Sequence, residues 1–235
     1  MKSMFGIRHF KHRNSGFHNW LIYRKTNAML ERNSKYFQGD VLDFGCGEMP
    51  YRDYILKHAS TYRGVDWPGT KHELRAEVFA DLNKSIPLAD EIADTIVSFS
   101  VLEHLYNPLG MLNEANRILK TGGHLVLSVP WQWQVHEAPH DYYRYSPYGL
   151  RHLLSQADFS VVSISPTGGA FSTLALKASY LLARLARGPR PVRLLLRLMV
   201  LPIQFFLQLV APILDRFDKN WSLEAPGYSV VAKKS

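Results

Sequence analysis

The sequence predicts an α/β fold, in which helices cover both faces of a mostly parallel sheet. Segments with the composition of strands alternate with helical segments along the chain. Asp94–Phe99 has the continuous apolar character of a strand buried on both faces, and a loop with two glycines follows the first strand at Gly45 and Gly47. The length of 235 residues suits one such domain with an added segment.

Seven segments are expected to form strands: residues 41–44, 62–66, 78–82, 94–99, 124–129, 159–165 and 228–232. Helices are expected over residues 16–37, 51–58, 108–119 and 147–157. Pro50 favours the first turn of the helix that follows it, and Gly122 and Gly123 stand where the C-cap of the helix over 108–119 would need glycine. Residues 1–37 are read as a basic arm and helix, and residues 170–221 as an insertion between the last two strands.

The positive charge is concentrated in one part of the chain. The formal net charge is +8, and residues 159–214 hold six Lys or Arg with no Asp or Glu, so the rest of the chain is nearly neutral. A nucleic-acid binder would more often place its cations among polar and aromatic residues, so nucleic acid is not favoured as a partner. Cys46 is the one cysteine, which fits a reducing compartment such as the cytoplasm, and the N-terminus does not resemble a secretory signal.

The glycine loop is the most specific local feature. In Asp43-Phe44-Gly45-Cys46-Gly47, glycine lets the backbone approach a ligand at the carboxyl end of the strand. By itself this loop could serve a dinucleotide, another nucleotide or only a tight turn. Asp66 ends the second strand and can accept the ribose hydroxyls of an adenosine. Asp81 follows the third strand and could receive an adenine amino group, or it could be a solvated loop acid.

Taken together, the runs VLDFGCG, GVD, ADL, DTIVSFSVLEHLYNP and RILKTGGHLVLSVP resemble class I S-adenosylmethionine-dependent methyltransferases of the type 11 group. The resemblance covers residues 41–130. It implies a Rossmann-like seven-stranded sheet with an antiparallel last strand, and S-adenosylmethionine as cofactor across the strand ends. The implied cofactor-binding residues are Asp43, Gly45 and Gly47 beside the methionine, Asp66 at the ribose, Asp81 and Leu82 at the adenine, and Ser98 and Ser100 in the floor. A full dinucleotide motif would need glycine where Pro50 stands.

Methyl transfer from a sulfonium is an in-line displacement, which a base assists when the acceptor is a hydroxyl. His104, His140 and Asp141 are the candidate catalytic residues, and the block from His140 to Pro147 resembles a recurring feature of one subset of these enzymes. The alternative is structural: His104 caps its turn, and His140 bonds a backbone carbonyl. No metal site is expected.

The insertion is apolar and basic. Residues 194–214 are close in length to a membrane span, but Arg197, Gln204 and Gln208 interrupt them, and Pro202 and Pro212 would kink or divide the helix. One helical stripe about 60° wide contains Arg193, Arg197, Gln204 and Gln208. This pattern predicts that residues 170–217 form two or more amphipathic helices in the membrane interface, with their cations towards anionic headgroups. A lid or a homodimer interface is the alternative.

These features lead to one preferred function. A methyltransferase at a membrane surface is expected to O-methylate a membrane-associated acceptor, such as a lipid-linked sugar or a surface polysaccharide, from the cytoplasmic side. The alternatives are methylation of a quinone or other small lipid, a non-catalytic membrane-associated adaptor on the same scaffold, and an RNA methyltransferase.

Overall fold

The computed structural model of the protein describes residues 16–69 and 75–235. Most of the predicted basic arm, residues 1–15, therefore lies outside the described residues. The chain forms two compact units. Among the described residues, the sheet unit contains 30–69, 75–165 and 228–235, and the helical unit contains 16–29 and 166–227. The predicted insertion, residues 170–221, falls within the helical unit.

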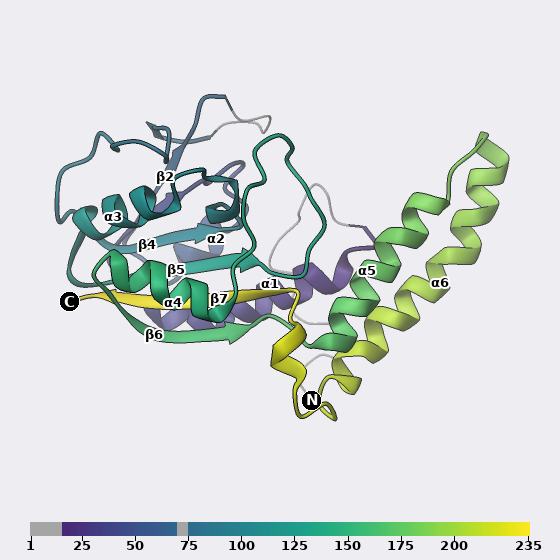
Figure 1. Cartoon of the computed structure of the whole chain (residues 1–235). Coiled ribbons are helices and arrows are strands. Elements are labelled where there is room, and N and C mark those ends of the chain that lie inside the picture. Colours follow the sequence, from purple (N-terminus) through teal and green to yellow (C-terminus); the bar gives the residue numbers. More distant parts are fainter. Residues whose placement is uncertain (1–15, 70–74) are drawn as a thin grey trace. The chain divides into compact units, whose positions relative to one another are not determined.

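The predicted seven-stranded sheet is confirmed, with strand order β3-β2-β1-β4-β5-β7-β6 (Figure 1). The strands are β1 (Asp40–Phe44), β2 (Thr61–Asp66), β3 (Val78–Phe79), β4 (Ala93–Phe99), β5 (Leu119–Pro130), β6 (Phe159–Pro166) and β7 (Gly227–Lys234). The pairs from β3 to β5 are parallel, and the last strands are antiparallel. The fold class expected from the sequence is therefore the observed one.

The centre of the sheet is its most buried part. β1 pairs with β2 on one side and β4 on the other, and residues 41–44 of β1 are all buried. Five of the seven residues of β4 are buried as well, which agrees with its apolar sequence. Because the carboxyl ends of β1, β2 and β4 meet at one edge, the loops that follow them gather there.

The helices of the sheet unit are α2 (Arg52–Ile55), α3 (Pro108–Ile118) and α4 (Pro147–Gln156), with the 3-10 turns η1 (Ser34–Tyr36) and η2 (Leu102–His104). Two helix starts follow directly from sequence. Asn107 accepts a hydrogen bond from the N–H of Gly110, and Ser146 accepts one from the N–H of Gly149. In each case proline occupies the first turn, where its missing N–H costs nothing.

The predicted glycine C-cap of α3 is wrong. β5 begins at Leu119, directly after α3, and already includes Gly122 and Gly123. Leu119 is buried and pairs with Ala93 of β4, so sheet pairing takes over before the glycines are reached. The helix expected over residues 51–58 is also shorter, at Arg52–Ile55, and the third strand ends at Phe79.

The helical unit is built around α5 (Ala170–Leu185) and α6 (Arg190–Leu214), which lie side by side as a hairpin (Figure 1). It also contains η3 (Trp221–Glu224) and the start of α1 (Trp20–Asn33), the helix that continues into the sheet unit. α6 runs unbroken through Pro202 and Pro212, which the sequence predicted to kink or divide it. Among the described residues, α6 is the one helix with the length and apolar composition of a membrane span.

The predicted polar stripe of α6 does not face outward along its whole length. Gln204 and Gln208 are buried, and their amides donate to the backbone oxygen and the hydroxyl of Ser179 on α5 at 2.8 and 3.2 Å. The side-chain oxygen of Gln208 also accepts the N–H of Leu21 in α1 at 2.9 Å. The part of the stripe that these glutamines form is therefore covered by protein, and they satisfy polar groups inside the helical unit.

Candidate functional site

The glycine loop after β1 has the bend that the sequence predicts. Gly45 and Gly47 adopt positive φ angles of +77° and +50°. A Cβ atom on Gly45 would lie 2.4 Å from Val101, whereas a Cβ on Gly47 would have no described atom within 4 Å. Packing against Val101 therefore requires glycine at position 45. At position 47 the left-handed backbone favours glycine, and the space beside Gly47 is open.

The carboxylate of Asp66 faces this loop. One oxygen accepts the N–H of Gly47 at 2.6 Å, and the other accepts the N–H of Trp67 at 2.7 Å. A carboxylate offers about four acceptor positions, so capacity remains for the hydroxyls of a ligand. The structure therefore brings two predicted binding residues, Gly47 and Asp66, into direct contact.

Asp43 lies behind the loop and is fully buried. The Tyr62 hydroxyl donates to its carboxylate. Burial raises the pKa of Asp43 to about 7, the Tyr62 hydrogen bond opposes this, and the charge of Asp66 adds to it. Burial, followed by the charges of Asp43 and Asp66, also raises the pKa of the Cys46 thiol. The raised pKa disfavours the reactive thiolate, so Cys46 fits this tight loop as a small residue.

The remaining predicted cofactor residues have varied surroundings. Asp81 accepts hydrogen bonds from the backbone and side-chain N–H groups of Asn83 and pairs with Lys84 at 3.4 Å. Ser98 is buried, and its hydroxyl donates to the carbonyl of Phe44 at 2.9 Å. Ser100 is exposed, with a positive φ of 56°, and Leu82 is buried. Asp81 thus forms a local turn, and the Ser98 hydroxyl ties β4 to β1.

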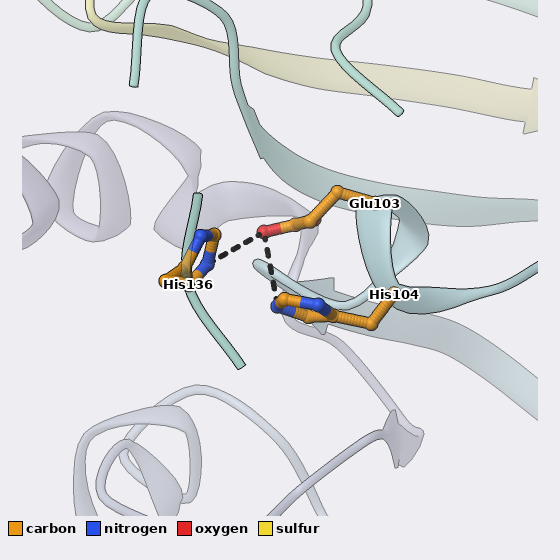
Figure 2. A group of neighbouring side chains, drawn as sticks. All are labelled: Glu103, His104 and His136. Atoms are coloured by element: carbon orange, nitrogen blue, oxygen red, sulfur yellow. Dashed lines mark ion pairs between the residues drawn. The ribbon is translucent and has the colours of Figure 1, made fainter. Parts of the chain in front are cut away.

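A second group of polar side chains follows β4 and β5. Glu103 and His104 belong to η2, and His136 lies in the loop after β5. Figure 2 shows the Glu103 carboxylate pointing towards both imidazole rings. One of its oxygens, Oε1, lies 3.7 Å from Nε2 of His104 and 3.7 Å from Nε2 of His136. We call these three residues the Glu–His cluster.

Glu103 is the residue that sequence reasoning missed. Its side chain is 0% exposed, and neither of its oxygens has a hydrogen-bond partner among the described residues. An ionised carboxylate in such a place is costly unless opposite charge balances it. The available signal was an acid between Leu102 and His104 directly after a buried strand, but sequence cannot show that the acid is enclosed.

A salt bridge supports the cluster from the side of the β5 loop. Arg144 holds both oxygens of Asp141, at 2.5 and 2.8 Å, which keeps the pKa of Asp141 well below its ordinary value against the opposing effect of partial burial. Asp141 also accepts the backbone N–H of His136 at 2.7 Å and lies 3.4 Å from its Nδ1. Glu103 raises the pKa of His136 above its ordinary value, burial opposes this, and Asp141 adds to the rise.

The predicted bases occupy different environments. His104 Nδ1 lies 2.5 Å from the carbonyl oxygen of His140, so it is His104 that bonds a backbone carbonyl. The His140 side chain is exposed, with Nδ1 3.2 Å from the Tyr142 hydroxyl and the ring edge-on to Trp67 at 5.7 Å between centroids. His140 therefore remains the accessible candidate base, while Asp141 is engaged by Arg144 and His136.

Comparison with known proteins gives one consistent result. Residues 20–164 match the model of a family described as a methyltransferase domain. A probable S-adenosylmethionine-dependent methyltransferase of Mycolicibacterium smegmatis is 31% identical over 115 residues, which are 46% of this chain and 45% of that protein. The matched region thus spans less than half the length of this curated relative.

Two solved structures share the fold. A methyltransferase from Archaeoglobus fulgidus described as dependent on S-adenosylmethionine gives a TM-score of 0.55 at 17% identity, over 91% of this chain and 94% of that one. A putative methyltransferase from Bacillus halodurans gives 0.54 at 13% identity, over 88% and 97%.

Proposed function

The chain belongs to the methyltransferase domain family, with S-adenosylmethionine as its cofactor, and we propose that it methylates a hydroxyl of a membrane-associated acceptor. A lipid-linked sugar or a surface polysaccharide is the preferred acceptor class. The observation that carries the enzymatic part is the contact between Asp66 and Gly47 beside open space. In this contact the Asp66 carboxylate, held by backbone N–H groups, lies next to a backbone segment that a ligand can approach closely.

The residues of this chain have separate tasks in the proposal. S-adenosylmethionine would supply the sulfonium methyl group. Asp66, held by two backbone N–H groups, would accept the ribose hydroxyls. Gly47 leaves room for the methionine part, and Gly45 keeps Val101 packed under the loop. Alignment of the acceptor with the methyl group and exclusion of water would account for most of the rate.

The proposed base is His140. Its ring contacts Trp67, the residue after Asp66, and this supports a position beside the predicted ribose site. In the reaction the acceptor oxygen forms a bond to the methyl carbon while the carbon–sulfur bond breaks and its electron pair stays on sulfur. The hydroxyl proton passes to a ring nitrogen of His140.

The direct test is calorimetric titration of S-adenosylmethionine into the folded full-length protein. We expect binding in a single class of site, and folded protein that shows none contradicts the proposal. Binding without methylation of any acceptor would favour the adaptor alternative. The acceptor is then sought by incubating labelled S-adenosylmethionine with cell extract and membranes and identifying the labelled product. A labelled quinone or labelled RNA would replace the preferred acceptor class.

The membrane part of the proposal rests on the tip of the α5–α6 hairpin, residues 181–200. Several apolar side chains there are at least 47% exposed: Leu181, Leu185, Leu194, Leu195, Leu198 and Met199. Exposed arginines accompany them at positions 184, 187, 190, 193 and 197. Monomeric proteins seldom expose such patches without a partner, and cations beside apolar groups suit an anionic lipid surface.

Flotation with vesicles tests this surface. We expect the protein to bind vesicles containing anionic lipid, with less binding as salt rises, because screening weakens the arginine contribution. Leu195→Glu should reduce binding, whereas Val162→Glu, at an exposed apolar position of β6, should not. Equal recovery in the soluble fraction with and without vesicles contradicts membrane binding. A salt-independent dimer lost in Leu195→Glu would show instead that the tip is a homodimer interface.

A further inference from the structure

We propose that Glu103, His104 and His136 form a binding site for one divalent transition metal ion, for which Zn²⁺ is the best match. The sequence predicted no metal site, because its two histidines are separated by thirty-one residues and only the fold brings them to one carboxylate. Two imidazoles and one carboxylate are a ligand set that Zn²⁺ takes in catalytic sites, where a fourth position stays open.

The distances suit a metal after small adjustments. One potential ligand atom from each residue lies within 4.8 Å of the others. Zn²⁺ bonds of about 2.0–2.1 Å in a tetrahedral arrangement separate ligand atoms by about 3.3 Å. The two 3.7 Å separations from Glu103 Oε1 to the histidine Nε2 atoms need to shorten by only a few tenths of an ångström. Rotation of the imidazole rings would bring their nitrogens closer together.

In both histidines the Nδ1 atom, which is the ring nitrogen not directed at Glu103, already lies near an oxygen atom. His104 Nδ1 faces the carbonyl of His140, which can only accept, so this nitrogen carries a proton. His136 Nδ1 faces Asp141 at 3.4 Å and the carbonyl of Gln134 at 3.3 Å. Metal-binding histidines are commonly oriented in this way by a carbonyl or carboxylate on the far nitrogen. With both histidines neutral, this arrangement leaves both Nε2 lone pairs directed at the same carboxylate.

The carboxylate provides independent support. Glu103 is fully buried, neither of its oxygens makes a hydrogen bond with the described residues, and 3.7 Å to each histidine is too long for one. Two imidazole lone pairs and a carboxylate repel each other unless positive charge lies between them. A divalent ion supplies that charge and gives Glu103 its missing partner.

The cluster lies at the same edge of the sheet as the glycine loop. Glu103 comes two residues after Val101, whose side chain packs against Gly45. His104 bonds the carbonyl of His140, and the ring of His140 contacts Trp67 next to Asp66. A role in catalysis rests on the proposed function: a metal here would lower the pKa of an acceptor hydroxyl, which then loses its proton to His140 and attacks the methyl carbon.

The test is metal binding by chelator-treated full-length protein, measured by calorimetry with Zn²⁺ and by elemental analysis after desalting. We expect about one Zn²⁺ per chain. His104→Ala and His136→Ala should each lower the affinity by more than about 100-fold, and Asp141→Asn by about 10- to 100-fold, because it orients His136. His152→Ala, an exposed histidine of α4 outside the cluster, is the matched control and should bind as wild type does.

The wild-type result alone can overturn the proposal. Folded wild-type protein that binds no Zn²⁺, Co²⁺ or Mn²⁺ would show that protons on the histidines balance Glu103 instead. Affinity unchanged in both alanine variants would place the metal elsewhere and overturn the assignment. Titration of S-adenosylmethionine into the same samples separates the two proposals: metal binding without cofactor binding would defeat the proposed function alone, and cofactor binding without metal binding would defeat the metal site alone.

Discussion

Asp215 of the helical unit and Glu103 of the sheet unit are both buried carboxylates, yet their surroundings are opposite. Asp215 accepts the N–H groups of Gly169 and Ser172, accepts the Ser172 hydroxyl, and lies 3.8 Å from the ammonium of Lys25. It closes the first turn of α5, where backbone N–H groups lack helical partners. Glu103 has no hydrogen-bond partner among the described residues and faces two histidines at 3.7 Å.

The difference separates structural from functional polar groups. A buried group that a fold keeps for stability is normally satisfied within the fold, as Asp215 is. A buried group left unsatisfied opposes stability and persists where something outside the folded chain completes it. Asp66 and Asp43 lie between these extremes. Asp66 accepts two backbone N–H groups, and Asp43 accepts one tyrosine hydroxyl.

The largest effect on stability is expected at the fully satisfied carboxylate. Asp215→Ala leaves two backbone N–H groups and a hydroxyl without this acceptor and removes the carboxylate that lies 3.8 Å from the ammonium of Lys25. We expect the free energy of unfolding of the helical unit to fall by about 3–5 kcal/mol, measured by urea denaturation followed by circular dichroism. Asp218→Ala, which removes one acceptor of the Asn220 N–H, is the control and should cost under about 1 kcal/mol. Equal losses would mean that Asp215 does not hold α5.

Asp66 should matter to the ligand more than to the fold. Asp66→Ala removes the acceptor proposed for two ribose hydroxyls, and hydrogen bonds to a charged group contribute about 1.5–3 kcal/mol each. We expect affinity for S-adenosylmethionine to fall by about 100-fold or more, measured by calorimetry. Asp53→Ala, an exposed acid on α2, is the control with unchanged affinity. Undiminished binding in Asp66→Ala would mean that this carboxylate only ties Gly47 to Trp67.

Local sequence patterns predicted the parts of the molecule that local chemistry decides. The strands at the centre of the sheet, the glycine loop, and the starts of α3 and α4 depend on apolar runs, on residues that tolerate positive φ, and on caps such as Asn107. The prediction that Gly122 caps the C-terminus of α3 was wrong because Leu119 pairs with Ala93, a residue distant in sequence. This pairing ends α3 before Gly122 is reached.

Long-range packing decided what the sequence could not. Helical periodicity showed that Gln204 and Gln208 share a face with Arg193 and Arg197, but not that α5 and α1 cover the part with the glutamines. Likewise the positions of Glu103 and His136 do not reveal that one carboxylate faces two rings. The spacing of residues in the sequence shows which side chains share a helix face. Only the whole fold shows which other elements cover that face.

Asp43 gives a pH-dependent contribution to stability. Its pKa is raised to about 7 by burial, so between about pH 4 and 7 the folded protein holds a proton there that the unfolded chain releases. This contribution is full below about pH 4 and is lost as the pH rises to about 7, with a slope of at most about 1.4 kcal/mol per pH unit. Urea denaturation at several pH values should show a smaller decline in Asp43→Asn than in wild type. Identical profiles would contradict burial as a source of the raised pKa.

The smallest change in stability is expected at Glu103. Glu103→Gln keeps the shape of the side chain and breaks no hydrogen bond that the described residues make, so chelator-treated protein should change its free energy of unfolding by less than about 1 kcal/mol. Zn²⁺ at about 100 times its dissociation constant should stabilise wild type by about 2.7 kcal/mol, and the variant should lose most of that gain. Urea denaturation with and without Zn²⁺ measures both quantities. If metal-free Glu103→Gln instead lost as much stability as Asp215→Ala, the carboxylate would be a structural partner of the two histidines, and the contrast between these two buried acids would disappear.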